Sequence, residues 1–248
     1  MPTQKFLAQQ KLLQQFAATY KTNASKRKKI NILGISCSTI NTDDNPPRVP
    51  SSEKILQDTL RYASKTYDVD SKVIKLRELN FDHCEANYSI DGTYCTRPCR
   101  LSQRKKEDEL LGVYNLIVDR ADIIVIATPL RRWSAASLYY KFIERLNCIE
   151  NQKEVYGVDL GGSRVTKNII VGAQDGVQAT LGQMMSFWAH LGCSFAKHPF
   201  VWYTAGNYTN DKLDLVPAQI ATDKKIIASQ YQEMIDAQIA LVQKLRKK

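Results

Sequence analysis

The chain has 248 residues, a formal net charge of +10 and 44% hydrophobic residues, which is ample for a packed core. No apolar run of about 18 residues predicts a membrane span, and the N-terminus lacks the apolar stretch of a signal peptide. We therefore expect a soluble, cytoplasmic protein without integral membrane association. Six cysteines without a secretory signal predict thiols rather than a disulfide framework.

The positive charge lies at the two ends of the chain. Residues 1–29 hold seven Lys or Arg and no acidic residue, residues 244–248 hold four more, and the body between them is close to neutral. Such ends can attract nucleic acid or anionic lipid, although a solvated terminus is the more ordinary reading. No aromatic residues interleave with a basic stripe in the body, so no nucleic-acid partner is expected.

Taken in chain order, the apolar pattern predicts alternating strands and helices. An amphipathic helix over residues 3–20 is followed by an exposed basic link at 25–29. Short apolar runs predict five strands, at residues 30–36, 72–77, 123–127, 167–173 and 200–203. Helices are predicted over 110–118 and over 220–245. A third helix starts after Ser51 or Ser52 as its N-cap, a fourth runs from Ser134 as its N-cap through Leu146, and a fifth ends with Gly192 as its C′ residue. This alternation predicts a doubly wound parallel sheet with right-handed crossovers.

The stretch 122–137, with the sequence DIIVIATPLRRWSAAS, is the most informative part of the chain. Its apolar run at 123–127 suits a strand buried on both faces, and Thr128 and Pro129 are expected to end that strand. In open α/β sheets, ligands bind beyond the carboxyl ends of the strands. Residues 128–137 are therefore predicted to form part of a binding site.

A polar loop follows the first predicted strand and leads into a helix. It contains Ser36, Ser38 and Thr39, and several prolines exclude regular structure before the helix begins. Backbone N–H groups and the helix dipole favour an anion at such a place. Neither G-x-G-x-x-G nor G-K-[ST] is present, so the loop suits a single terminal phosphate rather than a dinucleotide or a nucleoside triphosphate.

Together with the loop after the fourth strand, these loops resemble those of the NADPH-dependent FMN reductases of the flavodoxin-like superfamily. The resemblance covers roughly residues 30–204. It rests on Ser36, Ser38 and Thr39 in the first loop, on Thr128-Pro129-Leu130-Arg131-Arg132-Trp133 and Lys141-x-x-Glu144-Arg145 in and after the second, and on Gly172-Ala173-Gln174-Asp175-Gly176 in the third. It implies a flavodoxin-like, five-stranded parallel sheet of order 2-1-3-4-5 with helices on both faces, in a domain spanning 30–248, after a basic helical extension and linker at 1–29.

The resemblance also implies a function. In that family the first loop holds the flavin phosphate and the third lies along the polar edge of the ring system, so FMN is the implied cofactor and NAD(P)H the cosubstrate. Electrons would pass to a small-molecule acceptor such as a quinone or a flavin, in a homodimer or homotetramer. Because the cofactor carries the chemistry, no catalytic side chain is nominated. The implied cofactor-binding residues are Ser36, Ser38, Thr39, Thr128, Pro129, Leu130, Arg131, Arg132, Trp133, Ala173, Gln174, Asp175 and Gly176.

Ordinary structural roles for these residues also stay open. Ser36 and Thr128 can cap strand ends, Arg131 and Arg132 can be solvated, and Asp175 can cap a helix. The family has an aromatic-Gly pair where this chain has Arg132 and Trp133, so Trp133 either blocks the ring or swings out and stacks on it. Two alternatives follow: a flavodoxin-type electron carrier, which the near-neutral body charge disfavours, and a flavodoxin-fold binding protein that has lost FMN.

The cysteines give no clear site. Cys84, Cys95 and Cys99 lie close together in the sequence, but clusters and structural zinc ordinarily need four ligands, and the adjacent His83 is poorly placed to be one. We therefore expect no metal, and ordinary packing is favoured over a redox or disulfide role for Cys95 and Cys99. Cys37, Cys148 and Cys193 are expected to be small core residues.

Overall fold

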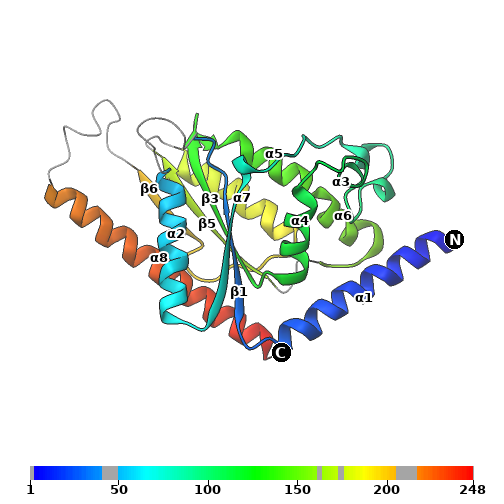
Figure 1. Cartoon of the computed structure of the whole chain (residues 1–248), viewed down its shortest axis with the longest axis horizontal. Coiled ribbons are helices and arrows are strands. Elements are labelled where there is room, and N and C mark those ends of the chain that lie inside the picture. The colour runs from blue at the N-terminus through cyan, green and yellow to red at the C-terminus, as the bar shows by residue number, and fades with distance from the viewer. Residues whose placement is uncertain (1–2, 41–49, 161–163, 173–175, 205–216, 248) are drawn as a thin grey trace.

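The structure is a computed structural model that describes residues 3–40, 50–160, 164–172, 176–204 and 217–247, with side chains described outside 167–172, 203–204 and 217–223. A central sheet carries helices on both faces (Figure 1). The strands are β1 Ile30–Ser36, β2 Val69–Lys75, β3 Ile123–Arg131, β4 Ser134–Ala135, β5 Val165–Gly172 and β6 Phe200–Thr204. The helices are α1 Gln4–Lys26, α2 Ser51–Thr66, α3 Arg100–Arg104, α4 Leu110–Asn115, α5 Ser137–Arg145, α6 Asn147–Tyr156, α7 Val177–His190 and α8 Pro217–Arg246.

The sheet has the topology of the flavodoxin-like fold. Five strands are parallel in the order β2-β1-β3-β5-β6, which is 2-1-3-4-5 when the parallel strands are counted along the chain. This confirms the predicted fold class and strand order. The short strand β4 was not predicted, and it pairs antiparallel with the end of β3.

Alternate residues of the central strands enter two separate cores. Leu33, Ile35, Ile124 and Ile126 pack on one face of the sheet with α4, α5, α6 and α7, whereas Ile32, Ile123 and Val125 pack on the other face with α2 and α8. Figure 1 shows α2 and α8 on one side of the strands and α4, α5 and α7 on the other. A strand covered on both faces needs apolar residues at every position, which explains the uninterrupted run at 123–127.

The prediction that Thr128 and Pro129 end the third strand is wrong. β3 continues to Arg131, and a two-residue turn at Arg132 and Trp133 returns the chain into β4. Both turn residues have positive φ, 49° and 60°, which is the backbone geometry of a tight hairpin. Thr128 stabilises the hairpin, because its Oγ1 accepts a hydrogen bond from the Ala136 N–H at 3.1 Å.

Two predicted helix caps are also wrong. Ser134 lies in β4, and α5 begins three residues later with Ala136 as an N-cap that makes no side-chain hydrogen bond. Similarly, α2 begins at Ser51 after Pro50, so Ser51 and Ser52 are its first residues and neither is its cap. In both places an adjacent turn or proline, and not a hydroxyl, fixes where the helix starts.

The N-terminal helix is longer than predicted and packs on the domain. α1 runs to Lys26, which leaves only residues 27–29 as the link, and its Leu13, Tyr20 and Ala24 are buried. The Tyr20 hydroxyl donates to the Ala121 carbonyl at 2.8 Å and lies 3.3 Å from Asp122 Oδ1. No helix of the described residues is long and apolar enough to cross a membrane.

Asp122 joins both ends of the chain to the amino end of the sheet. Its buried carboxylate accepts hydrogen bonds from the Asn31 N–H and from Arg246 Nη2, both at 2.8 Å. Arg246, at the end of α8, also donates to the backbone carbonyls of Arg27 and Lys29 at 3.1 and 3.0 Å. Part of the terminal basicity seen in the sequence is therefore used to hold α1, β1 and α8 together.

Candidate functional site

The predicted site loops begin on neighbouring strands at the carboxyl edge of the sheet. Ser36 at the end of β1 is in register with Ala127 of β3, and Pro129 of β3 is in register with Val171 of β5. The Cys37 N–H continues this pairing by donating to the Ala127 carbonyl at 2.8 Å. The carboxyl ends of β1, β3 and β5 therefore lie side by side. We call this edge the rim.

The hairpin turn at 132–133 lies directly against the backbone of Gly176. Gly176 has a φ of +104°, and a Cβ atom there would lie 2.9 Å from the Trp133 carbonyl oxygen and 3.0 Å from its Cα. Thr180, in the first turn of α7, donates from Oγ1 to the same Trp133 carbonyl at 3.2 Å. Only glycine fits this approach, so the chain brings the β3–β4 hairpin against the start of α7.

A side-chain relay fixes the hairpin further. The hydroxyls of Ser134 and Tyr140 are hydrogen bonded to one another, and the Tyr140 hydroxyl donates to Gln183 Oε1 at 3.0 Å. These residues belong to β4, α5 and α7 respectively. The tip of the hairpin is therefore held in place before any ligand arrives, which lowers the ordering cost of binding.

The predicted binding residues fall into three groups by exposure. Ser36, Ser38, Thr128, Pro129 and Leu130 are buried, Thr39, Arg131, Arg132 and Trp133 are exposed, and Gly176 is intermediate. Ala173, Gln174 and Asp175 lie outside the described residues. Trp133 is 57% exposed, so more than half of its surface is left free by the protein. Among the described residues of the rim, Thr39 and the hairpin tip are therefore the exposed parts.

A buried carboxylate that was not predicted lies next to Ser36. Glu53, in the first turn of α2, is 2% exposed and accepts a hydrogen bond from Ser36 Oγ at 3.2 Å. Arg77 donates to both of its oxygens, and Lys75 Nζ lies 3.5 Å from Oε1. Burial alone would raise the pKa of Glu53, but the hydrogen bond and charge of Arg77, with Lys75 and Ser36, outweigh it and hold the pKa below its usual value.

Two features at the start of α2 favour a bound phosphate, and one feature opposes it. The buried Ser52 hydroxyl has no hydrogen-bond partner among the described residues, and it lies in the first turn of a 16-residue helix whose dipole favours an anion. Glu53 opposes a second negative charge. Arg77 and Lys75 supply two positive charges, but Glu78 pairs with both of them, at 3.6 and 3.1 Å, so that with Glu53 the local charges balance. The Ser52 hydroxyl and the helix dipole are therefore the features that favour an anion here.

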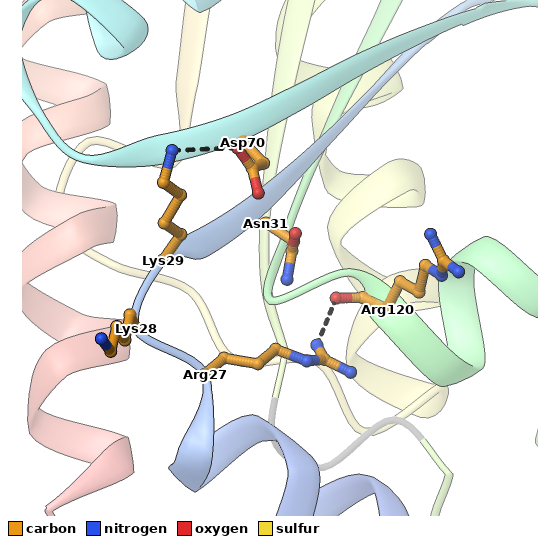
Figure 2. Close-up of a pocket in the computed structure, with 6 residues that line it drawn as sticks. All are labelled: Arg27, Lys28, Lys29, Asn31, Asp70 and Arg120. Atoms are coloured by element: carbon orange, nitrogen blue, oxygen red, sulfur yellow. Dashed lines mark hydrogen bonds and ion pairs between the residues drawn. The ribbon is translucent and has the colours of Figure 1, made fainter.

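A cavity of about 360 Å³ lies at the opposite end of the sheet and does not overlap the predicted site. It is lined by Arg27, Lys28, Lys29, Asn31, Asp70 and Arg120. Figure 2 shows Lys29 directed at Asp70 and Arg27 extended toward the backbone of Arg120. Arg27 and Lys29 are thus already paired within the protein.

The cysteines of the described residues are all free, and no group of three or more His, Cys, Asp or Glu in that part of the chain is arranged to hold a metal ion. Cys37, Cys148 and Cys193 are buried, as predicted for small core residues. Cys95 is buried as well, whereas Cys84 and Cys99 are partly exposed.

No protein-family model matches the chain, and no curated protein matches its sequence. Solved structures do match its fold. A crystal structure of RosB with the bound intermediate OHC-RP (8-demethyl-8-formylriboflavin-5'-phosphate) is 14% identical with a TM-score of 0.66, and the match covers 88% of this chain and 81% of RosB. A flavone reductase is 16% identical with a TM-score of 0.53, covering 86% of this chain and 63% of the reductase. An azoreductase from Bacillus anthracis str. Sterne is 12% identical with a TM-score of 0.52, covering 84% of this chain and 98% of the azoreductase. Similarity at this level of identity establishes that the chain has the flavodoxin-like fold.

Proposed function

We propose that this protein is a flavin-dependent oxidoreductase that binds FMN along the rim and uses NAD(P)H to reduce a small acceptor such as a quinone or a flavin. The observation that carries the proposal is the meeting of turns distant in the sequence: the turn at 132–133 touches Gly176, and the turn after Ser36 leaves the neighbouring strand. Ligands of open α/β sheets bind at this edge. The names of the similar structures, among them reductases and a complex with a riboflavin phosphate, support the same ligand class.

The phosphate end of the ligand is assigned to the start of α2. Ser52 supplies a hydroxyl without a partner among the described residues, Thr39 is exposed in the preceding loop, and the dipole of α2 favours an anion. A phosphate bound here gains both charge-assisted hydrogen bonds and the field of the helix dipole. This end of the site would therefore distinguish FMN from riboflavin, which lacks the phosphate.

The ring end is assigned to the hairpin tip and the start of α7. Trp133 presents an exposed aromatic side chain beside Gly176, and Arg131 and Arg132 keep positive charge in the same turn. An aromatic side chain held at a fixed tip can stack on a flat ring, and the two guanidinium groups favour anionic ligands such as the phosphates of NAD(P)H. When bound, FMN supplies the redox chemistry by accepting hydride and passing electrons on.

Titration with FMN and with riboflavin tests the proposal. The purified protein should quench FMN fluorescence saturably, bind FMN at least about tenfold more tightly than riboflavin, and show a flavin band at about 450 nm that bleaches with NADH or NADPH under nitrogen. Ser52→Ala should weaken FMN without weakening riboflavin. Ser64→Ala, near the other end of α2, is the matched control and should change neither. Failure to take up FMN would refute the proposal.

A second candidate is a flavodoxin-fold binding protein that has lost FMN, and Glu53 is the observation that favours it. A carboxylate 3.2 Å from the Ser36 hydroxyl occupies a place where a phosphate-binding loop would ordinarily offer a free donor. This candidate predicts a colourless protein that does not bind added FMN. Mixing with NADPH distinguishes the reductase from the alternative electron carrier, since NADPH does not by itself bleach the flavin band of a carrier. The proposed homodimer or homotetramer is tested by light scattering on the purified chain.

A further inference from the structure

Three cationic side chains at the amino end of the sheet are left without a partner in the part of the chain that the structure describes. Lys28 lies in the link between α1 and β1, Lys72 lies in β2, and Arg120 ends the π-helix Leu116–Arg120. All three side chains are exposed, and none of them makes a hydrogen bond or an ion pair with a described residue.

Two adjoining cavities connect these three side chains. Lys28 borders the larger cavity, of about 360 Å³, and Lys72 borders the smaller one, of about 190 Å³. Arg120, Asn31 and Asp70 border both, so the two cavities form one depression that we call the amino-end groove. Figure 2 shows Lys28 and Arg120 on opposite sides of the larger cavity, with the Asn31 side chain between them.

The groove exists because β2 is the edge strand of the sheet. Asn31 and Leu33 of β1 are in register with Asp70 and Lys72 of β2, so these four side chains lie on the same face. On β1, Leu33 is buried in the core that includes α4, whereas Asp70 and Lys72 of β2 are exposed. The edge strand therefore forms a wall of the groove that a ligand can reach.

The acidic residues in and next to the groove already have cations of the protein as partners. The pairs are Asp68 and Asp70 with Lys29, Asp119 with Arg97, and Asp122 with Arg27 and Arg246. Because these four carboxylates are matched by four cations, Lys28, Lys72 and Arg120 leave a surplus of three positive charges along the groove. Figure 1 shows that the basic C-terminal end of α8 also reaches the junction of α1 and β1, which adds to the attraction for an anion.

We propose that the amino-end groove binds an anion with two or more linked phosphate groups. A single phosphate group lies in one cavity or the other, whereas a chain of phosphates extends from Lys28 past Arg120 to Lys72. The Arg120 guanidinium group is suited to bidentate hydrogen bonds with phosphate oxygens, and the two lysines act as point charges on flexible stems. The Asn31 side-chain amide has no hydrogen-bond partner among the described residues, and it supplies a further donor at the middle of the groove.

Calorimetric titration of the full chain with sodium tripolyphosphate tests the proposal. One tripolyphosphate should bind per chain, at least about tenfold more tightly than orthophosphate, and the affinity should fall as the salt concentration rises. Arg120→Ala and Lys72→Ala should each weaken binding at least about fivefold. Neither should lower the melting temperature, since neither side chain has a partner to lose. Lys153→Ala, an exposed lysine of α6 outside the groove, is the matched control and should bind like the wild type.

The source of the phosphate chain is distinguished with ATP as a second probe. Tighter binding of ATP than of tripolyphosphate would identify a nucleotide as the ligand, and equal or weaker binding would identify the phosphate chain alone. Three results would overturn the proposal: no saturable binding of tripolyphosphate, unchanged binding by Arg120→Ala, or an equal loss in Lys153→Ala. Cosedimentation with phosphatidylserine vesicles in the absence of tripolyphosphate binding would also overturn it, because the surplus charge would then serve a membrane surface.

Discussion

Each end of the sheet holds a buried carboxylate, and the two differ in what surrounds them. At the amino end, Asp122 is saturated by groups of β1, α1 and α8, and the two terminal helices close over it. At the carboxyl end, Glu53 is saturated by Ser36, Arg77 and Lys75. Beside it, however, the Ser52 hydroxyl has no partner among the described residues and the hairpin tip is exposed.

The difference separates polar groups that build the fold from polar groups that are available to a ligand. A buried charge is tolerated when the chain itself supplies its partners, and the amino end is such a case. The exposed guanidinium groups of Arg131 and Arg132, beside the exposed Trp133, make no comparable hydrogen bond or ion pair with any of the described residues. Substitutions at the amino end should therefore change the free energy of unfolding and leave ligand binding at the rim unchanged. At the rim, a substitution can change ligand binding without an equal change in the free energy of unfolding.

The largest effect is expected at Asp122. Asp122→Ala leaves the Asn31 N–H without its partner and Arg246 without its ion-pair partner, and breaking a buried pair in this way costs about 3–5 kcal/mol in the free energy of unfolding. Urea denaturation measures the loss. Asp68→Ala removes an exposed carboxylate paired with Lys29 and should cost less than about 1 kcal/mol. Equal losses in the two variants would contradict the structural role given to Asp122.

Gly176→Ala should be the most damaging small change at the rim. The substitution places a Cβ at positive φ and within 2.9 Å of Trp133, so we expect a loss of about 2 kcal/mol in the free energy of unfolding. Gly182→Ala, in the middle of α7 with no atom near the added Cβ, is the matched control and should stabilise the protein by about 0.5–1 kcal/mol. If both substitutions changed the free energy of unfolding in the same direction, the contact between the hairpin and α7 would be contradicted.

Glu53 should make stability depend on pH in the acid range. Because its pKa is lowered in the folded protein, its contribution is complete above the unfolded pKa of about 4.3 and is lost as the pH falls through the folded pKa. Glu53→Gln should cost about 1.5 kcal/mol at neutral pH and flatten the decline below pH ~4.5. Urea denaturation at a series of pH values checks this, and an unchanged acid slope in the variant would refute it.

The smallest effect on stability is expected at Trp133. Trp133→Ala removes an exposed side chain and should change the free energy of unfolding by less than about 0.5 kcal/mol. If Trp133 stacks on the flavin, the same change should weaken FMN about 5–10-fold, as expected for one lost aromatic contact. Trp202→Ala, an exposed Trp of β6, controls for the loss of an aromatic residue in general. Tighter FMN binding by Trp133→Ala would mean that this side chain blocks the ring.

Much of the fold could be predicted because burial on both faces leaves a plain signal. The run at 123–127 is apolar throughout and the strand at 30–36 is apolar except at Asn31 and Ser36, and no other element explains such runs as well. The hairpin could not be predicted, because Arg132 and Trp133 adopt positive φ without the Asn or Gly that usually marks such a turn. Its two residues are held there by Gly176 and Thr180, which lie more than forty positions away in the sequence.

The candidate site was only partly predictable for the same reason. Serine and threonine after a strand indicate a polar loop, but nothing in the sequence pairs Ser36 with Glu53 or Glu53 with Arg77, since those contacts form only when α2 and the end of β2 meet. The same holds for Cys99, whose sulfur lies 3.7 Å from Nη2 of Arg145, a residue of α5. Spacing along the chain reveals clusters within one segment and misses those that the fold assembles.

The most direct test is amide hydrogen exchange with and without FMN. It compares peptides covering the rim, at 36–40, 128–134 and 176–180, with peptides covering the amino end, at 27–31 and 119–122. Binding at the rim predicts that FMN slows exchange in the first set and leaves the second unchanged, because the exposed residues of the hairpin tip and Thr39 lie in the first set. Protection confined to the amino end, or no protection at saturating FMN, would contradict the assignment of the rim as the functional site.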